Sequence, residues 1–103
     1  MNMDINKLMQ QAQAMQKQLE EASRQINEME FEGSASNGLV KVTVNGENKV
    51  LSVDIEAEIL NPEDRDMLQD LIMIAVNDAI SKAEDYKQNR LGSMASAMGL
   101  PVR

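Results

Sequence analysis

The fold is decided by the stretch GSASNGLVKVTVNGENKVLSVDIEAEILNP, which runs from Gly33 to Pro62. Valines alternate with polar residues over positions 40–44, and apolar residues alternate with polar ones again over positions 51–55. A period of two in β-branched residues predicts two β-strands. Asn45-Gly46 between them suits a tight turn, because both residue types tolerate positive φ. We therefore expect a β-hairpin.

The predicted hairpin has one apolar face. A loop of two residues (45–46) or of four residues (45–48) gives the same parity of strand pairing. In either case one face carries Val40, Val42, Val44, Leu51, Val53 and Ile55. Such a face needs a cover, and the two long helical segments that flank the hairpin are the candidates.

An apolar heptad seam predicts the first helix, over about residues 4–29, and Asp4 is a suitable N-cap. The seam consists of Ile5, Leu8, Ala12, Met15, Leu19, Ala22, Ile26 and Met29. This helix either lies on the hairpin or projects beyond its domain and pairs with another helix. A helix of about 25 residues spans roughly 37 Å, whereas a compact domain of about 100 residues has a radius of gyration near 13 Å. Its length favours projection.

The segment before the hairpin predicts a short edge strand and then a loop. Over residues 28–35, Met29 and Phe31 alternate with acidic residues, and residues 33–38 read GSASNG. A loop with glycine and serine also suggests a phosphate cradle. However, the spacing matches neither the dinucleotide nor the Walker signature, so a connector between strands is the better interpretation.

The second helix is predicted from about Asn61 to Arg90, with Asn61 as its cap and Pro62 in its first turn. Its apolar face consists of Leu68, Leu71, Ile72, Ala75, Val76, Ala79, Ile80 and Ala83, widened by Met67, Met73 and Ile74. A face this broad fits a well-buried helix of a monomer, or a helix covered by its own sheet and by a partner chain. We favour the second. Residues 91–103 are expected to form a flexible tail after a single domain spanning residues 1–90.

This order of elements predicts an α+β protomer, α-β-β-β-α, in which two long helices flank a three-stranded antiparallel sheet. If the helices pack antiparallel, the start of the first meets the end of the second. Lys7 would then lie near Lys87 and Arg90, far from the sheet. A symmetric dimer of such protomers would carry two arms with relatively basic tips.

The composition disfavours enzymatic chemistry. The chain has no cysteine, which fits a reducing cytoplasm, and no histidine, the commonest general base. We see no nucleophile–base pair and no cofactor motif, so we expect no catalysis, no cofactor and no small-molecule substrate. The row Asp54, Glu56 and Glu58 could hold a divalent cation, but an exposed polar strand face explains it more simply.

Charge is distributed unevenly within the net charge of −7. Residues 1–19 carry two basic and one acidic side chain, and residues 86–103 carry three basic and none acidic. Residues 20–85 carry five basic and sixteen acidic side chains. Both ends are therefore mildly basic around an acidic middle. No apolar run of eighteen residues and no leader-like segment is apparent, so we expect no membrane contact.

Several segments, in this order, are similar to one known family. They are NKLMQQAQAMQ (6–16), EGSASNGLVKVTVNG (32–46), VLSVDI (50–55), PEDRDMLQDLI (62–72), AVNDAISKAE (75–84) and MGLP (98–101). On these motifs the chain resembles the YbaB/EbfC family of bacterial nucleoid-associated proteins. The resemblance implies a tweezer-like homodimer that binds double-stranded DNA through protruding helical arms, with a role in chromosome organisation or gene regulation.

The resemblance also implies which residues face DNA. Carried onto this chain, they are Lys7, Gln10, Gln11, Lys17, Lys82, Lys87 and Arg90. Many members carry a lysine where this chain has Gln10, so its arms are less cationic. The leading hypothesis is a cytoplasmic, nucleoid-associated, non-enzymatic DNA-binding dimer. The alternative is a dimeric protein-interaction scaffold with weak or no DNA binding, because the heptad seam and nine methionines also suit protein partners.

Overall fold

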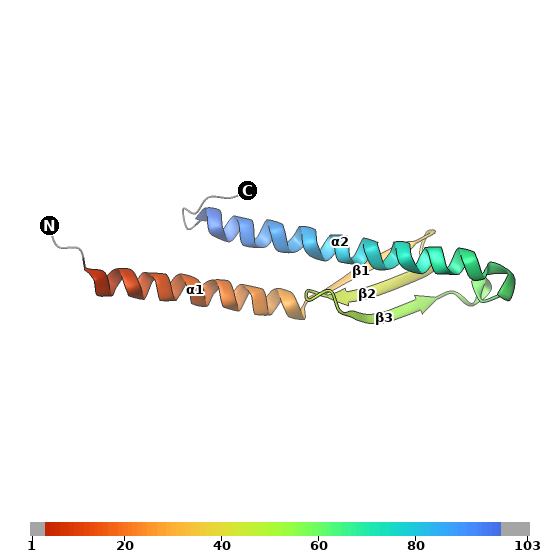
Figure 1. The fold of residues 1–103 in the computed structure, drawn as a ribbon, viewed down its shortest axis with the longest axis horizontal. Helices are drawn as coiled ribbons and strands as arrows, with labels where there is room; N and C mark the ends of the chain where they lie inside the picture. Colours follow the sequence, from red (N-terminus) through yellow and green to blue (C-terminus); the bar gives the residue numbers. More distant parts are fainter. Residues whose placement is uncertain (1–3, 98–103) are drawn as a thin grey trace.

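The computed structural model describes residues 4–97 and has the predicted order of elements (Figure 1). Helix α1 (Ile5–Glu28) is followed by strands β1 (Glu30–Ala35), β2 (Val40–Asn45) and β3 (Val50–Ile55), two 3₁₀ turns (Ala57–Ile59 and Pro62–Asp64) and helix α2 (Arg65–Ala97). The sheet is antiparallel in the order β1-β2-β3. The α+β fold with a three-stranded sheet and two long helices is therefore confirmed.

The protomer is long and thin. It measures 77 × 22 × 16 Å with a radius of gyration of 20.3 Å, well above the roughly 13 Å of a compact domain of this size. Helix α1 leaves the sheet at one end, and α2 runs back over the sheet and beside the second half of α1 (Figure 1). The predicted projection of the first helix is confirmed: the buried residues of α1 are Ala22 and Ile26, both near the sheet. Asp4 caps α1 as predicted, because its carboxylate accepts a hydrogen bond of 3.1 Å from the Lys7 N–H.

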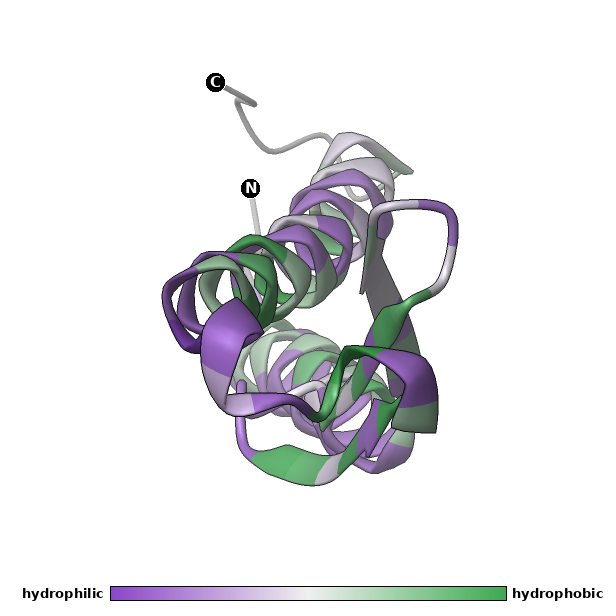
Figure 2. Ribbon diagram, turned by 90° about the vertical axis from the view of Figure 1, so that its right-hand side faces the viewer, coloured by the Kyte–Doolittle hydropathy of each residue, from purple (hydrophilic) through white to green (hydrophobic). Residues whose placement is uncertain are grey.

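The core lies between α2 and the first two strands. Its fully buried residues are Val40, Val42 and Val44 of β2 and Ala75, Ala79 and Ala83 of α2. The alanines recur every four residues and so form one stripe along α2. Viewed from the sheet end, the strands lie on one side of α2 and carry apolar segments (Figure 2). Small side chains on the helix let it approach the valines of the sheet closely.

The hairpin has the predicted shared face, but with a β-bulge. Val42 lies opposite Val53 and Val40 opposite Ile55, as expected. Near the turn the register shifts, so that Val44 faces Val50 and Leu51 is the extra residue. The strict alternation expected over positions 51–55 is therefore interrupted at Leu51, which the bulge leaves without a partner on β2.

The turn chemistry also differs from the prediction. Positive φ occurs at Asn48 (64°) and not at Asn45 or Gly46. The turn is held instead by the Asn45 side chain, whose oxygen accepts hydrogen bonds from the N–H groups of Glu47 (2.9 Å) and Lys49 (3.0 Å). Gly46 is needed for a different reason. A side chain there would overlap the carbonyl of Ile26, because the last turn of α1 packs directly on it.

Three boundaries were predicted inaccurately. Strand β1 extends to Ala35, so the loop is shorter than residues 33–38, and its turn is made by the positive φ of Ser36, Asn37 and Gly38. Asn61 does not cap a helix with its side chain, which donates to the Glu58 carbonyl oxygen instead (3.0 Å). Helix α2 continues past Arg90 to Ala97.

The extension of α2 has a simple cause. Residues 91–97 contain no proline and include Leu91, Met94 and two alanines, and one glycine costs a helix only about 1 kcal/mol. Residues 91–97 are therefore helical and not an irregular tail. The rest of the predicted tail, residues 98–103, lies outside the described residues, and the proposed domain boundary at residue 90 stays a prediction.

Helix α2 covers only part of the sheet. It packs on β1 and β2, whereas Val50, Leu51 and Val53 of β3 remain exposed, with Val53 at 46%. On α2 itself, Met73 is 57% exposed. We call Val50, Leu51, Val53 and Met73 the open apolar face.

Candidate nucleic-acid interface

The seven residues expected to face DNA do not lie together at one tip. Lys7, Gln10 and Gln11 lie on the outer half of α1, beyond the end of α2 (Figure 1). Lys17 lies in the middle of α1 and, like Arg90, lines the groove between the two helices. Lys82 and Lys87 lie further back along α2, towards the sheet.

An open groove between α1 and α2 brings two of the expected residues together. Its volume is about 430 Å³ and its lining consists of Lys17, Gln18, Glu21, Ala22, Gln25, Arg90 and Met94. Lys17 and Arg90 come from different helices, so this cationic pair exists only in the folded chain. The predicted meeting of Lys7 with Lys87 and Arg90 was wrong. Arg90 instead lines a groove whose α1 residues begin at Lys17, about 15 Å from Lys7 at the helical rise.

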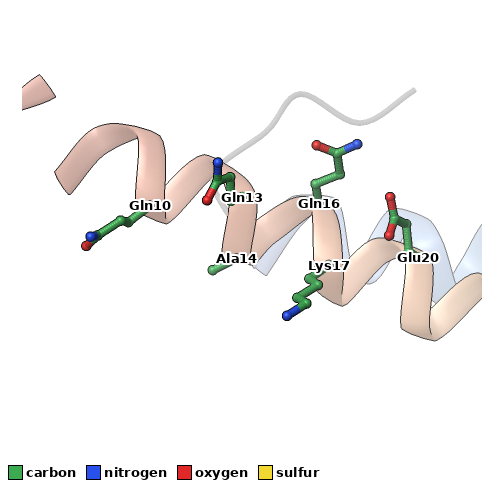
Figure 3. Close-up of a pocket in the computed structure, with 6 residues that line it drawn as sticks. All are labelled: Gln10, Gln13, Ala14, Gln16, Lys17 and Glu20. Carbon is green, nitrogen blue, oxygen red and sulfur yellow. The ribbon is translucent and has the colours of Figure 1, made fainter. Parts of the chain in front are cut away.

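The outer surface of α1 carries a row of amides around Lys17. A shallow hollow there is lined by Gln10, Gln13, Ala14, Gln16, Lys17 and Glu20. Gln10 and Lys17, seven residues apart, project to one side of the helix, and Gln13, Gln16 and Glu20 project to the other (Figure 3). Two turns separate Gln10 from Lys17, or about 10 Å. This side of the arm therefore presents an amide and a cation in line.

Lys82 is engaged at the edge of the sheet. Its ammonium donates to the Glu32 carbonyl oxygen at 3.0 Å and lies 3.3 Å from the Asp78 carboxylate. Asp78 in turn accepts a hydrogen bond of 3.1 Å from the Ser34 N–H. That hydrogen bond, with Lys82 nearby, lowers the pKa of Asp78 from its ordinary value. Lys82 thus supplies a hydrogen-bond donor to the outer edge of β1. It does not lie at an arm tip.

Lys87 is also tied to the fold. Its ammonium lies 2.9 Å from the Glu84 carboxylate, and its side chain is only 23% exposed. Glu84 also accepts a hydrogen bond of 2.8 Å from the Asn48 amide. The Lys87 side chain, followed by the Asn48 amide, lowers the pKa of Glu84. Because its charge is offset, Lys87 is a weaker candidate for phosphate contact than Arg90.

Arg90 is positioned by aromatic side chains. Its guanidinium donates to the Tyr86 hydroxyl oxygen at 3.3 Å, and the Tyr86 ring packs on Phe31 with ring centroids 5.7 Å apart. Within residues 4–97, neither Arg90, Lys17 nor Lys7 has a carboxylate within ion-pair distance. These three cations are therefore available to an anionic partner.

Sequence reasoning did not single out Gln18, Gln25 or Met94 as site residues. Gln18 and Gln25 lie seven residues apart on the flank of the heptad seam, a spacing that places them on one helix face. That signal was present in the sequence. No such signal pointed to Met94, because the second helix was expected to end before this residue.

Across residues 4–97, no cluster of three or more carboxylate, histidine or cysteine side chains is arranged to hold a metal ion. None of the helices in that range is long and apolar enough to cross a membrane.

Comparison with known proteins identifies the family. The model of the YbaB/EbfC DNA-binding family matches residues 1–98. The chain belongs to this family. YbaB/EbfC is a family of DNA-binding proteins and not of enzymes, and the resemblance seen in the sequence motifs is thereby confirmed.

Relatives in the YbaB/EbfC family align with nearly the whole chain. A "Nucleoid-associated protein" of Alkaliphilus metalliredigens is 41% identical over 98 residues, covering 95% of this chain and 86% of the relative. A protein of the same name from Corynebacterium kroppenstedtii is 42% identical over 96 residues, covering 93% and 96%. The crystal structure of the uncharacterized protein HP0035 of Helicobacter pylori matches with a TM-score of 0.75 at 24% identity, covering 90% of this chain and 98% of that one. This last match supports the fold alone.

Proposed function

We propose that the protein is a non-enzymatic, nucleoid-associated DNA-binding protein that grips duplex DNA with its helical arms. The observation that carries the proposal is that Lys17 and Arg90 both line the groove between α1 and α2. Two cations from different helices, without carboxylate partners in the described chain, suit a phosphate group. Lys7 would add a third contact further along α1.

Binding of this kind is mainly a contact with the DNA backbone. Gln10 and Gln13 would donate hydrogen bonds to phosphate or sugar oxygens, or to base edges. The two aromatic residues pack on each other near the sheet, so insertion of a ring between base pairs is not expected. We expect weak sequence preference and a strong dependence on salt, which suits a role in chromosome organisation or gene regulation in the bacterial nucleoid, within the cytoplasm.

The same proposal includes a homodimer formed through the open apolar face. Val50 and Val53 pair with the fully buried Val44 and Val42 of β2 but are themselves exposed, as are Leu51 and Met73. A cluster of exposed apolar side chains of this kind marks a protein interface. A second copy would cover the other side of α2 and β3, and would give the dimer two arms. That arrangement would be the tweezer-like shape that the family resemblance implies.

The test is fluorescence anisotropy of a labelled DNA duplex titrated with the protein at two salt concentrations about fourfold apart. The Lys17→Gln, Arg90→Gln variant should bind several-fold more weakly and lower the salt slope by about two per engaged arm. The control is Lys41→Gln, Arg65→Gln, which removes the same charge from the sheet and from the start of α2. Equal losses in both variants would show that net charge, and not the groove, governs binding.

A second candidate is a dimeric protein-interaction scaffold. The observation that favours it is the exposed apolar side chains of α1, including Ile5 and Leu8, which suit a protein partner better than DNA. The same titration separates the two functions. Absence of binding even at the lower salt concentration would favour the scaffold.

A further inference from the structure

Lys17 has two acidic neighbours on its own helix. Glu20 and Glu21 follow it by three and four residues, and residues at these spacings are neighbours on a helix surface. Among the ion pairs of residues 4–97, neither carboxylate is paired with Lys17. The ammonium that the proposed function requires is therefore available although two carboxylates lie within reach of it.

Glu20 is directed away from Lys17. The Glu20 carboxylate and the Gln16 amide project to one side of α1, whereas the Lys17 ammonium projects to the other (Figure 3). The direction of its side chain thus removes Glu20 as a partner.

Glu21 is kept from Lys17 by a different partner. It lines the groove between α1 and α2 together with Lys17 and Arg90. Its carboxylate accepts a hydrogen bond from the Arg24 guanidinium and forms an ion pair with it. This hydrogen bond lowers the pKa of Glu21, so the carboxylate is charged at neutral pH. Arg24 therefore holds the negative charge that lies nearest to Lys17 in the groove lining.

The order of the charges along α1 favours this choice of partner. On a helix, an acid that precedes its basic partner makes a better pair than one that follows it, because this order suits the helix dipole. Glu21 precedes Arg24 by three residues and follows Lys17 by four. Glu21 thus pairs with Arg24 in preference to Lys17.

We propose that Arg24 is a positioning residue of the DNA site, which holds the Glu21 carboxylate away from Lys17 and so leaves Lys17 free for a phosphate group. The inference rests on the proposed function, because Lys17 is one of its phosphate contacts. Without Arg24, the Glu21 carboxylate would pair with Lys17 and compete with the phosphate. The effect of Arg24 on DNA binding thus passes through Glu21 and needs no contact between Arg24 and DNA.

The first test is a double-mutant cycle measured by fluorescence anisotropy of a labelled DNA duplex. Arg24→Gln should bind about two- to fourfold more weakly than the original chain, the range expected for one exposed ion pair. In a Glu21→Gln background, the same substitution should cause little further loss, because no carboxylate is released. Equal losses in the two backgrounds would overturn the proposal, since Arg24 would then act by direct contact or by net charge.

Glu28 provides the matched control for this cycle. It follows Arg24 by four residues and lies outside the groove lining. Glu28→Gln therefore removes the same charge from the other side of Arg24. In this background, Arg24→Gln should still weaken DNA binding about two- to fourfold. Loss of the effect here as well would contradict a specific role for Glu21.

The second test needs no DNA and so separates this inference from the proposed function. Carbon-13 NMR follows the titration of the Glu21 carboxyl group. In the Arg24→Gln background, adding Lys17→Gln should raise the pKa of Glu21, because Lys17 has become its partner. In the original chain, Lys17→Gln should change that pKa less. An equal effect of Lys17→Gln in both backgrounds would overturn the exchange of partners, whereas absence of DNA binding by the original chain would overturn the proposed function.

Discussion

Gly33 of β1 lies against the backbone of Ala79 of α2, with no room for a side chain between them. A methyl group on Gly33 would lie 2.8 Å from the Ala79 Cα and would overlap the Ala79 nitrogen and the Ala75 carbonyl oxygen. Glycine on the strand and alanine on the helix therefore set the distance between the sheet and α2. The conformation of Gly33 is ordinary, and its small size is what the fold requires.

Replacing Gly33 with alanine should therefore destabilise the fold. The expected loss is about 2–3 kcal/mol in the free energy of unfolding, the range typical of overpacking in a rigid site. Urea denaturation followed by circular dichroism measures it. The neighbouring Ser34→Ala variant, on the exposed side of β1, keeps the backbone N–H that binds Asp78 and should change stability by less than about 0.5 kcal/mol. Similar stabilities of the two variants would argue against this close contact.

A substitution at Gly46 should loosen the arm and leave the sheet folded. Gly46→Ala would place a methyl group 2.9 Å from the Asn27 Cα and against the Ile26 carbonyl. Helix α1 rests on this turn and has few other contacts, so we expect faster hydrogen exchange in its second half, with sheet amides unaffected. Glu47→Ala, one residue further along the exposed turn, is the control. Uniformly faster exchange across α1 and the sheet would mean that the turn supports the whole fold.

Asp78 should make stability dependent on pH in the acidic range. Its pKa in the folded state is lowered below its ordinary value, mainly by the hydrogen bond from the Ser34 N–H. A group with a lowered pKa stabilises the fold above its unfolded pKa, and this contribution is lost as pH falls through the folded pKa. Asp78→Asn should thus be less stable than the original chain at neutral pH. In urea titrations, the difference should shrink as the pH falls below about 4, whereas a constant difference would rule out the carboxylate charge as its source.

The open apolar face predicts the effect of a charge on dimerisation. Val53→Lys places an ammonium on the face shared with the buried Val42 and should shift the proposed dimer to a monomer, as measured by light scattering. Ser52→Lys adds the same charge on the other side of β3, where Ser52 pairs with Thr43. It should leave the dimer intact. If both variants remain dimeric, the interface lies elsewhere.

Local patterns in the sequence were sufficient for the order and type of the elements. The alternation around Val42 predicted β2, the heptad seam from Ile5 predicted α1, and Asp4 was found as its cap. Each signal depends on residues within a few positions of one another, where the periods of helix and strand are directly visible. The alternation of faces along the two strands, joined by a loop with an even number of residues, was enough to place Val53 and Val42 on the same face.

Features that depend on contacts distant in sequence were not predicted. The need for glycine at positions 33 and 46 comes from helices packed against them and not from turn geometry. Lys82 at the edge of β1 likewise bonds a residue distant in sequence, through the Glu32 carbonyl oxygen. For the candidate site, the sequence supplied Lys17 and Arg90 separately, but their pairing depends on where two long helices cross. That is why Lys7 was placed beside Arg90 and Lys17 was not.

The two long helices of the protomer would respond differently to a force applied at their outer ends. Helix α2 is continuous from Arg65 to Ala97. Its inner half is packed in the core, and its outer half is a rigid extension of that half. Helix α1 meets β1 through the single extended residue Met29, and its buried residues, Ala22 and Ile26, both lie in its last turns. A force exerted by a bound ligand would therefore displace α1 more easily than α2. A change in the distance between the outer ends of the two helices would come from a movement of α1 relative to the sheet, while α2 stays in place.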